Sequence, residues 1–388
     1  MKLLRRIEAW TVSAGIVLAT AASAQQEQWL QYHTTREGRG YTWLDLTTNP
    51  PPNVVLPKFT AAPYFARWAT PLDATGGRWL CFDRSRRSGP YDRVIYDRNN
   101  NGRLDDEAPI DAARLESTSA YFDPLRFVFK GEDGPITYHL GLRFMAYSDG
   151  EVRLLAQGGG WYEGMVNLAG KKRRVALIDG NVNGVFNDLA LKSHDCDRIR
   201  IGEDKDENAD ERYLGRLLEV DGQFYQIEVA RDGAFIKVKK AENLALGPVR
   251  VPTTISQLTA VGENGQFLRK PANGEFSLPA GRYTVHNWAI DRKDSKGAAW
   301  KLSGSASSDS AEFEVAAAQA TPLQVGEPVL ASLSATESKS AVAFGLRLKG
   351  SLGESIEILK GTQRPRAPQL LVASAGSSFR ATNTFEYG

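Results

Sequence analysis

The stretch Thr137-YHLGLRFMA-Tyr147 runs through Asp149-Gly150 into Val152-RLL-Ala156. Apolar residues alternate or run together on both sides of an Asp-Gly pair, which is a strong signal for a two-stranded hairpin. Asp221-Gly222 and Asp232-Gly233 separate further segments of the same kind. After the first 24 residues, no segment keeps a 3.6-residue apolar period for three turns, so the pattern predicts an all-β, antiparallel fold.

The strand-rich pattern is interrupted at Ala245-Leu246-Gly247-Pro248, which is the best candidate for a domain boundary. The segment before Tyr64 has little periodicity and contains the stiff run Asn49-PPP-Asn53. We therefore expect an antiparallel, sheet-rich N-terminal domain followed by a smaller β-sandwich. The expected segments are an extended lead-in over 25–60, a β-rich domain over 61–244, a sandwich over 248–361 and an irregular tail over 362–388.

The chain begins with basic residues and an apolar run, Ala9 to Ala22, that ends in Ala22-Ser23-Ala24. A basic region, a short apolar run and an A-x-A site are typical of a cleaved secretory signal. We therefore expect residues 1–24 to be removed, and the mature protein to be periplasmic or extracellular, with no membrane span after cleavage.

The charge balance is nearly even, with 48 Lys and Arg against 46 Asp and Glu. Residues 1–24 hold three of the bases, Lys2, Arg5 and Arg6, and one acid, Glu8, so the remainder has 45 of each. A neutral mature chain gives no electrostatic case for binding nucleic acid.

Two short apolar segments each run into a loop of the form D-x-N-x-N-G. Oxygen side chains at positions one, three and five can converge on one hard cation, and the glycine at six allows the sharp turn. These side chains are Asp97, Asn99 and Asn101 in the first loop and Asp179, Asn181 and Asn183 in the second. Both loops are candidate Ca²⁺ sites.

These loops resemble the calcium loops of EF-hand and dockerin-type modules, a resemblance that implies further ligands. Arg103 and Val185 stand at position seven, and the nearby acids Asp105 and Asp188 complete the two candidate ligand sets. Position twelve, a carboxylate in those families, holds alanine in both loops.

The alternative is a tight β-turn without an ion, because Asp and Asn bond their own backbone and favour a following Gly. A third, weaker copy follows, in which Asp204, Asp206 and Asn208 have ligand spacing. Ala209 occupies its glycine position, so a solvated acidic loop is the better interpretation.

Cys81 and Cys196 are the only cysteines, and the expected compartment is oxidising. Either they pair, closing a long loop, or they are two independent buried thiols.

The segment Asn273-GEFSLPAGRYTVHNWA-Ile290 resembles the prealbumin-like sandwiches of carboxypeptidase regulatory-like modules. The resemblance implies an accessory sandwich in which two strands form a hairpin around the Pro-Ala-Gly turn. The chain as a whole resembles secreted bacterial β-rich proteins that carry Asp-Asn-Gly loops and an appended sandwich.

Two functions fit these features. The first is a non-catalytic, calcium-stabilised scaffold that binds an extracellular polymer or an envelope protein. The second is a carbohydrate-active hydrolase with two facing carboxylates, for which Glu163 and Asp149 are candidates. Glu163 lies in Gly158-GGWYE-Gly164, which suits either a sugar platform or, more simply, strands bending around a core tryptophan. The scaffold is the favoured interpretation.

Overall fold

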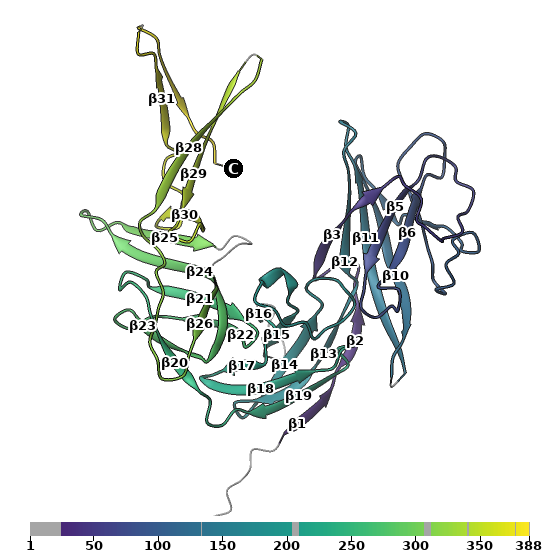
Figure 1. The fold of residues 1–388 in the computed structure, drawn as a ribbon, viewed down its shortest axis with the longest axis horizontal. Coiled ribbons are helices and arrows are strands. Elements are labelled where there is room, and N and C mark those ends of the chain that lie inside the picture. The colour runs from purple at the N-terminus through teal and green to yellow at the C-terminus, as the bar shows by residue number, and fades with distance from the viewer. Residues whose placement is uncertain are drawn as a thin grey trace, which may run out of the picture.

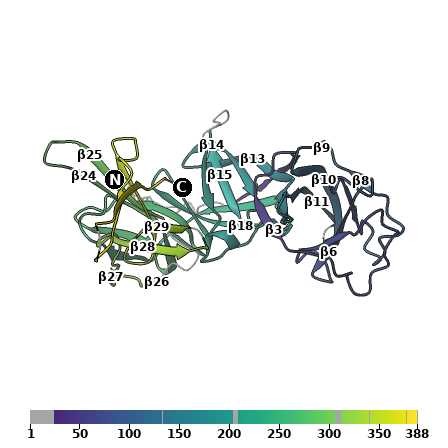
Figure 2. The same ribbon diagram turned by 90° about the horizontal axis from the view of Figure 1, so that it is seen from above.

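The computed structural model describes residues 25–132, 134–203, 209–305, 312–339, 341–376 and 378–387. The expected signal peptide and residues 204–208 of the third loop lie outside these ranges. Among the described residues, every regular element is a strand apart from one short 3₁₀ turn at Ser193–Asp195. The prediction of an all-β, antiparallel fold is confirmed. The strands form three sandwiches in a row, with the second in the middle (Figures 1 and 2).

The first sandwich packs two five-stranded sheets face to face. One sheet has the order β4 (Leu46–Thr47), β5 (Tyr64–Ala69), β6 (Gly77–Asp83), β7 (Arg93–Tyr96) and β8 (Ile110–Asp111). The other has the order β3 (Tyr41–Leu44), β12 (Val152–Gly158), β11 (Pro135–Ala146), β10 (Ser119–Lys130) and β9 (Arg114–Leu115). The ring of Phe82 contacts those of Phe122 and Phe144, so inward-facing aromatic side chains join the two sheets.

The second sandwich is built in the same way. Its first sheet has the order β2 (Gln31–Thr34), β13 (Gly160–Leu168), β14 (Lys171–Ile178), β15 (Arg198–Gly202) and β16 (Asp210–Tyr213). Its second sheet has the order β1 (Gln26–Trp29), β19 (Phe235–Lys240), β18 (Gln223–Val229) and β17 (Leu217–Val220). Inward-facing residues such as Leu177, Ile199 and Ile236 are buried between the sheets.

The two sandwiches share one strand order. The path β4-β5-β6-β7-β8 matches β2-β13-β14-β15-β16, and β3-β12-β11-β10 matches β1-β19-β18-β17. The N-terminal segment supplies two short strands to each, and the dipeptide Trp-Leu recurs at Trp29-Leu30 and Trp43-Leu44. The expected lead-in over 25–60 is therefore wrong, because this segment completes both sandwiches. Strands of two to four residues are too short to show a period.

One continuous core runs through both sandwiches, so the β-rich domain expected over 61–244 is built as two sandwiches that share this core. Trp68 of β5 stacks on Tyr138 of β11, with ring centroids 5.3 Å apart. Tyr138 in turn contacts Phe186, which lies on the second Asp-Asn-Gly loop, at 6.3 Å. This loop therefore joins the core of the second sandwich to that of the first.

The third sandwich has a separate core that includes Trp288, Tyr283 and Phe267. Its small sheet has the order β23 (Glu275–Pro279), β20 (Leu246–Arg250) and β27 (Thr321–Pro322). Its large sheet has the order β22 (Gly265–Arg269), β21 (Gln257–Gly262), β24 (Gly281–Lys293), β25 (Ala299–Ser305), β30 (Ser355–Lys360), β29 (Val342–Lys349) and β28 (Leu330–Glu337), with β26 (Glu312–Val315) beside β24. The expected boundary at Gly247-Pro248 falls inside β20.

The hairpin expected around Pro279-Ala280-Gly281 is absent, because β23 and β24 belong to different sheets. The turn instead carries the chain from one sheet to the other. The hydroxyl of Tyr283 donates a 2.8 Å hydrogen bond to the Pro279 carbonyl, and Asn264 donates one of 2.9 Å to that of Ala280. These two contacts hold the crossover, and the local sequence does not distinguish it from a hairpin.

The tail over 362–388 is not irregular, because β31 (Gln369–Ala373) pairs with β32 (Arg380–Thr384). This hairpin and the β28–β29 hairpin project beyond the third sandwich, and their tips point apart (Figure 1).

Candidate functional site

The first Asp-Asn-Gly loop follows β7 and folds around the carboxylate of Asp97. Its two oxygens accept hydrogen bonds from the backbone N–H groups of Asn101 (3.1 Å) and Gly102 (2.8 Å). Asn99 Oδ1 accepts from Asn101 N at 3.0 Å, and Asn101 Oδ1 accepts from Arg103 N at 2.9 Å. The oxygens of positions one, three and five thus gather in a single turn.

The second loop follows β14 and repeats each of these contacts. The carboxylate of Asp179 accepts from the N–H groups of Asn183 (3.2 Å) and Gly184 (2.7 Å). Asn181 Oδ1 accepts from Asn183 N at 3.2 Å, and Asn183 Oδ1 accepts from Val185 N at 2.9 Å. Four matching hydrogen bonds show that the two sequences form one local structure.

A carboxylate at position ten closes each loop. The amide of Asn101 donates a 2.7 Å hydrogen bond to Asp106, and that of Asn183 donates one of 2.6 Å to Asp188. Asp105 instead forms an ion pair with Arg103 at 2.7 Å. Asp106, an acid outside the candidate ligand set, therefore takes the place expected of Asp105. The equal spacing of Asp106 and Asp188 from their loop starts was the signal that could have identified it.

The donor set of each loop fits a hard divalent cation. Carboxylates at positions one and ten supply two negative charges, and the amides at three and five and the carbonyl at seven supply neutral oxygens. Binding would exchange the amide-to-carboxylate hydrogen bonds for bonds from oxygens to the ion. Among the described residues, no three His, Cys, Asp or Glu side chains group as a metal site. Because affinity follows ligand charge, these loops would bind calcium weakly.

The second loop lies in the interior, whereas the first is mostly at the surface. Burial raises the pKa of the Asp179 carboxyl to about 7, although the Gly184 N–H lowers it. Burial and then the nearby Asp179 raise the pKa of Asp197 well above its ordinary value. Asp197 accepts hydrogen bonds from the N–H groups of Gly180 (3.0 Å) and Asp188 (2.7 Å). A cation at this loop would offset two buried carboxylates.

The loops occupy different connections in the duplicated fold. The first joins β7 to β8, and the second joins β14 to β15. The connection equivalent to the first loop is 203–209, between β15 and β16, where the third, weaker copy of the motif lies. The third copy of the motif therefore follows the repeat of the sandwiches in the sequence, whereas the second loop does not.

Cys81 and Cys196 are free and buried, which excludes the disulfide alternative in this structure. Burial raises the pKa of both thiols, that of Cys196 to about 11. Neither is therefore a ready nucleophile, since the thiolate is the reactive form.

The carboxylates considered for hydrolysis have structural partners. Asp149 lies in the exposed β11–β12 turn and accepts a hydrogen bond from Glu151 N at 3.0 Å. Glu163 accepts from the indole N–H of Trp161 at 3.3 Å and lies 3.6 Å from Arg174. In the Gly158–Gly164 stretch, it is Tyr162 that is buried, whereas Trp161 stacks on His33.

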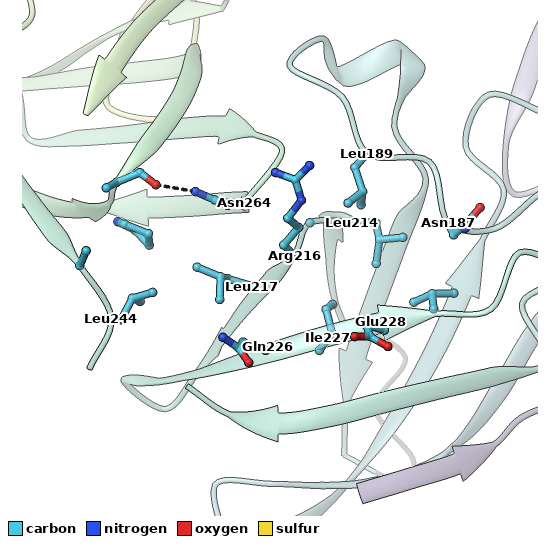
Figure 3. Close-up of a pocket in the computed structure, with 15 residues that line it drawn as sticks. Asn187, Leu189, Leu214, Arg216, Leu217, Gln226, Ile227, Glu228, Leu244 and Asn264 are labelled. Atoms are coloured by element: carbon cyan, nitrogen blue, oxygen red, sulfur yellow. Dashed lines mark hydrogen bonds between the residues drawn. The ribbon is translucent and has the colours of Figure 1, made fainter. Parts of the chain in front are cut away.

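A cleft of about 640 Å³ lies between the second and third sandwiches (Figure 3). Its walls are largely apolar, with Leu189, Leu214 and Ile227 on the second sandwich and Leu244 at the start of the third. Glu228 is the one acid among the fifteen residues that line it. A pair of carboxylates facing across this cleft is therefore absent from its described walls.

An aromatic pair is exposed on the outer face of the first sandwich. Tyr41 (61% exposed) and Trp43 (53%) lie two residues apart on β3, so they share a face and lie about 7 Å apart along the strand. They lie opposite Gln157 and Leu155 of β12. This pair was not expected from the sequence, because tryptophan is usually largely buried.

The second sandwich repeats the exposed tryptophan. Trp29 (72% exposed) lies on β1 opposite Phe235 of β19, with ring centroids 5.1 Å apart. β1 borders its sheet as β3 borders its own, so Trp29 and Trp43 hold equivalent places. We name Trp29, Phe235, Tyr41 and Trp43 the aromatic surface.

Comparisons with protein-family models, with curated proteins and with solved structures gave no match. Within the described residues, no helix is long and apolar enough to cross a membrane. Function is carried by the side chains of a site rather than by the fold.

Proposed function

We propose that this chain is a non-catalytic, extracytoplasmic β scaffold, stabilised by calcium at its two Asp-Asn-Gly loops, that binds a glycan polymer at the cell envelope. The observation that carries the proposal is the exposed tryptophan at the same place in both members of a duplicated sandwich. Exposed aromatic clusters mark binding surfaces more often than isolated apolar residues do.

The arrangement suits a repeating ligand. Tyr41 and Trp43 offer two exposed aromatic rings on one face of a strand, and the ring of an indole or phenol can cover the apolar face of a sugar. Trp29 offers the equivalent contact on the next sandwich. Two linked sites of the same kind gain avidity for a polymer that carries the same unit many times.

The loops support this role by ordering the scaffold. The second loop holds the core contact between the two sandwiches that carry the aromatic surface. A cation that binds only the folded state adds stability in proportion to RT ln(1 + [L]/Kd). Calcium would thus fix the relative position of Trp29 and Trp43 without contacting the polymer.

The test is retention of the purified mature chain by insoluble glycans, namely peptidoglycan sacculi, chitin and cellulose. Trp29→Ala and Trp43→Ala should each lower the affinity for the retained glycan by about tenfold or more, and the double variant should remove retention, because the avidity of two linked sites is lost. Leu268→Ala is the matched control, since Leu268 is also an exposed apolar residue but lies on β22 of the third sandwich.

Two outcomes would count against the proposal. If the double tryptophan variant were retained as well as the wild type, the aromatic surface would not be the binding site. If no glycan were retained but the same variants lost an envelope protein in a pull-down, the partner would be a protein.

A further inference from the structure

The strand β28 forms the outer edge of the eight-stranded sheet of the third sandwich. It pairs only with β29, in an unbroken register from Leu330↔Lys349 to Glu337↔Val342. All eight of its residues are exposed, and the hairpin projects beyond the sandwich (Figure 1). Alternate residues of an edge strand direct unpaired N–H and C=O groups to solvent, so β28 offers a ready pairing edge.

This edge lacks the protection found on the other sheet edges of the chain. Among the described strands, every other edge strand has five residues or fewer, whereas β28 has eight. Residues 330–336 contain no charge and no proline, and the register shows no bulge. Short length, charge, proline and bulges are the devices that keep natural edges from pairing. Their joint absence here indicates an edge that pairs.

The sequence of β28 identifies the partner. Ala331-Ser332-Leu333-Ser334-Ala335 reads the same in both directions. Antiparallel pairing with an identical strand, centred on Leu333, would set Leu333 opposite Leu333, each serine opposite a serine and each alanine opposite an alanine. This like-to-like arrangement is that of an isologous, two-fold interface, in which the same patch serves both copies.

The two faces of the hairpin are suited to such pairing. Ala331, Leu333 and Ala335 share one face with the half-buried Phe344 and Leu346 of β29, and the serines lie on the other. Joining two hairpins would create four strands with one continuous apolar face and one hydroxyl face. A two-stranded hairpin alone is only marginally stable, whereas three or more strands with an apolar face can be stable on their own. The β31–β32 hairpin is not hydrogen-bonded to β28, so the edge is open.

We infer that β28 pairs antiparallel with β28 of a second copy of this chain, about a two-fold axis at Leu333, and so makes the protein a homodimer. This inference does not depend on the proposed glycan binding. The dimer would place two aromatic surfaces in one particle.

The experiment is sedimentation equilibrium of the full mature chain over a range of concentrations, with circular dichroism to confirm folding. The wild type should reach a dimer and stop there. Leu333→Glu places two like charges directly opposite one another and should raise the dissociation constant by about tenfold or more. Leu333 is 57% exposed, so its fold should survive the change.

The decisive measurement mixes two variants that carry opposite charges at Leu333. Leu333→Lys should also be monomeric alone, but an equal mixture of Leu333→Glu and Leu333→Lys should dimerise again, since opposite charges then meet at the axis. Ala343→Glu, exposed on β29 away from the edge, should dimerise like the wild type. A wild type that stays monomeric, a dimer that survives Leu333→Glu, or open-ended polymers in place of a dimer would each overturn the inference.

Discussion

The indole N–H of Trp68 donates a 2.7 Å hydrogen bond to the backbone carbonyl of Val182, across the boundary between the first two sandwiches. Val182 has a left-handed backbone, with φ of +58°, which is costly for a β-branched residue. Both residues are almost fully buried. The hydrogen bond therefore satisfies a carbonyl that the strained turn directs into the core, and it fixes the second Asp-Asn-Gly loop against the first sandwich.

Replacing Trp68 tests whether its hydrogen bond to the second loop stabilises the contact between the first two sandwiches. Trp68→Phe leaves the Val182 carbonyl buried without its donor, which costs about 1–3 kcal/mol of unfolding free energy, in addition to the lost volume. The measurement is chemical denaturation followed by intrinsic fluorescence and circular dichroism. The matched control is Trp300→Phe, which also loses an indole hydrogen bond, but one to the half-buried side chain of Asp294. Equal losses of unfolding free energy in the two variants would contradict a special role for the contact between Trp68 and the second loop.

The calcium sites can be tested with two neighbouring acids of the first loop. Asp106→Asn should reduce the rise in melting temperature that millimolar calcium gives over chelator-treated protein, because Asp106 closes the ring of oxygens. Asp105→Asn should leave that rise intact, because Asp105 faces Arg103. The measurement is differential scanning calorimetry of both variants with calcium and with chelator.

The second loop gives the corresponding pair of results, in which Asp188→Asn should reduce the calcium response and Asp149→Asn, in an ordinary hairpin turn, should not. Magnesium should act less than calcium, since its octahedral demand suits these loops poorly. If chelator leaves the melting temperature of the wild type unchanged, both loops are turns without an ion.

The strands could be predicted because their signals are local. Alternation and the Asp-Gly turns marked β11, β12, β18 and β19 without any tertiary information. The duplication could not be predicted, because β1 has four residues and its partner β19 lies at the far end of the second sandwich. Pairing of such a strand is decided by the cross-strand contact of Trp29 and Phe235, which no sequence window contains.

The candidate site could also be predicted only where its signal is local. Positions one, three, five and six of each loop form one local turn, so their side chains could be identified from spacing. The exposed tryptophans could not be identified, since exposure depends on which face of β3 the first sandwich covers. Burial of Asp179 was likewise hidden, because it results from the packing of Trp68 and Phe186 around the loop.

A pH dependence is expected where the second and third sandwiches meet. His286 of β24 lies edge-on to Tyr213 of β16, with ring centroids 5.3 Å apart. Burial, and then the charge of Arg198, lowers the pKa of His286 in the folded state. The unfolded chain therefore binds this proton more readily, with a pKa of about 6.5. The stability that the fold has with His286 neutral is therefore complete above pH about 6.5. It is lost as the pH falls toward the pKa of His286 in the folded state.

The measurement is the melting temperature between pH 8 and pH 5 for the wild type and His286→Gln. The variant should lose less stability than the wild type over the acid half of this range. His194→Gln, in the exposed 3₁₀ turn, should follow the wild type. If the melting temperature of His286→Gln falls with pH in parallel with that of the wild type, His286 is not the source of the pH dependence.

The last prediction concerns the independence of the third sandwich, whose core is separate from that of the first two. A fragment of residues 242–388 keeps the whole of β20, which pairs with β23 and β27 and holds the small sheet together. It should fold alone and give a dispersed amide NMR spectrum. A fragment of 248–388 lacks Leu246 and Gly247, so it loses two of the five β20–β23 pairs and should be markedly less stable. Because Leu217 and Phe224 of the second sandwich pack on this core, even the longer fragment exposes apolar surface and should melt below the intact chain. A collapsed spectrum for both fragments would mean that the second and third sandwiches form one folding unit.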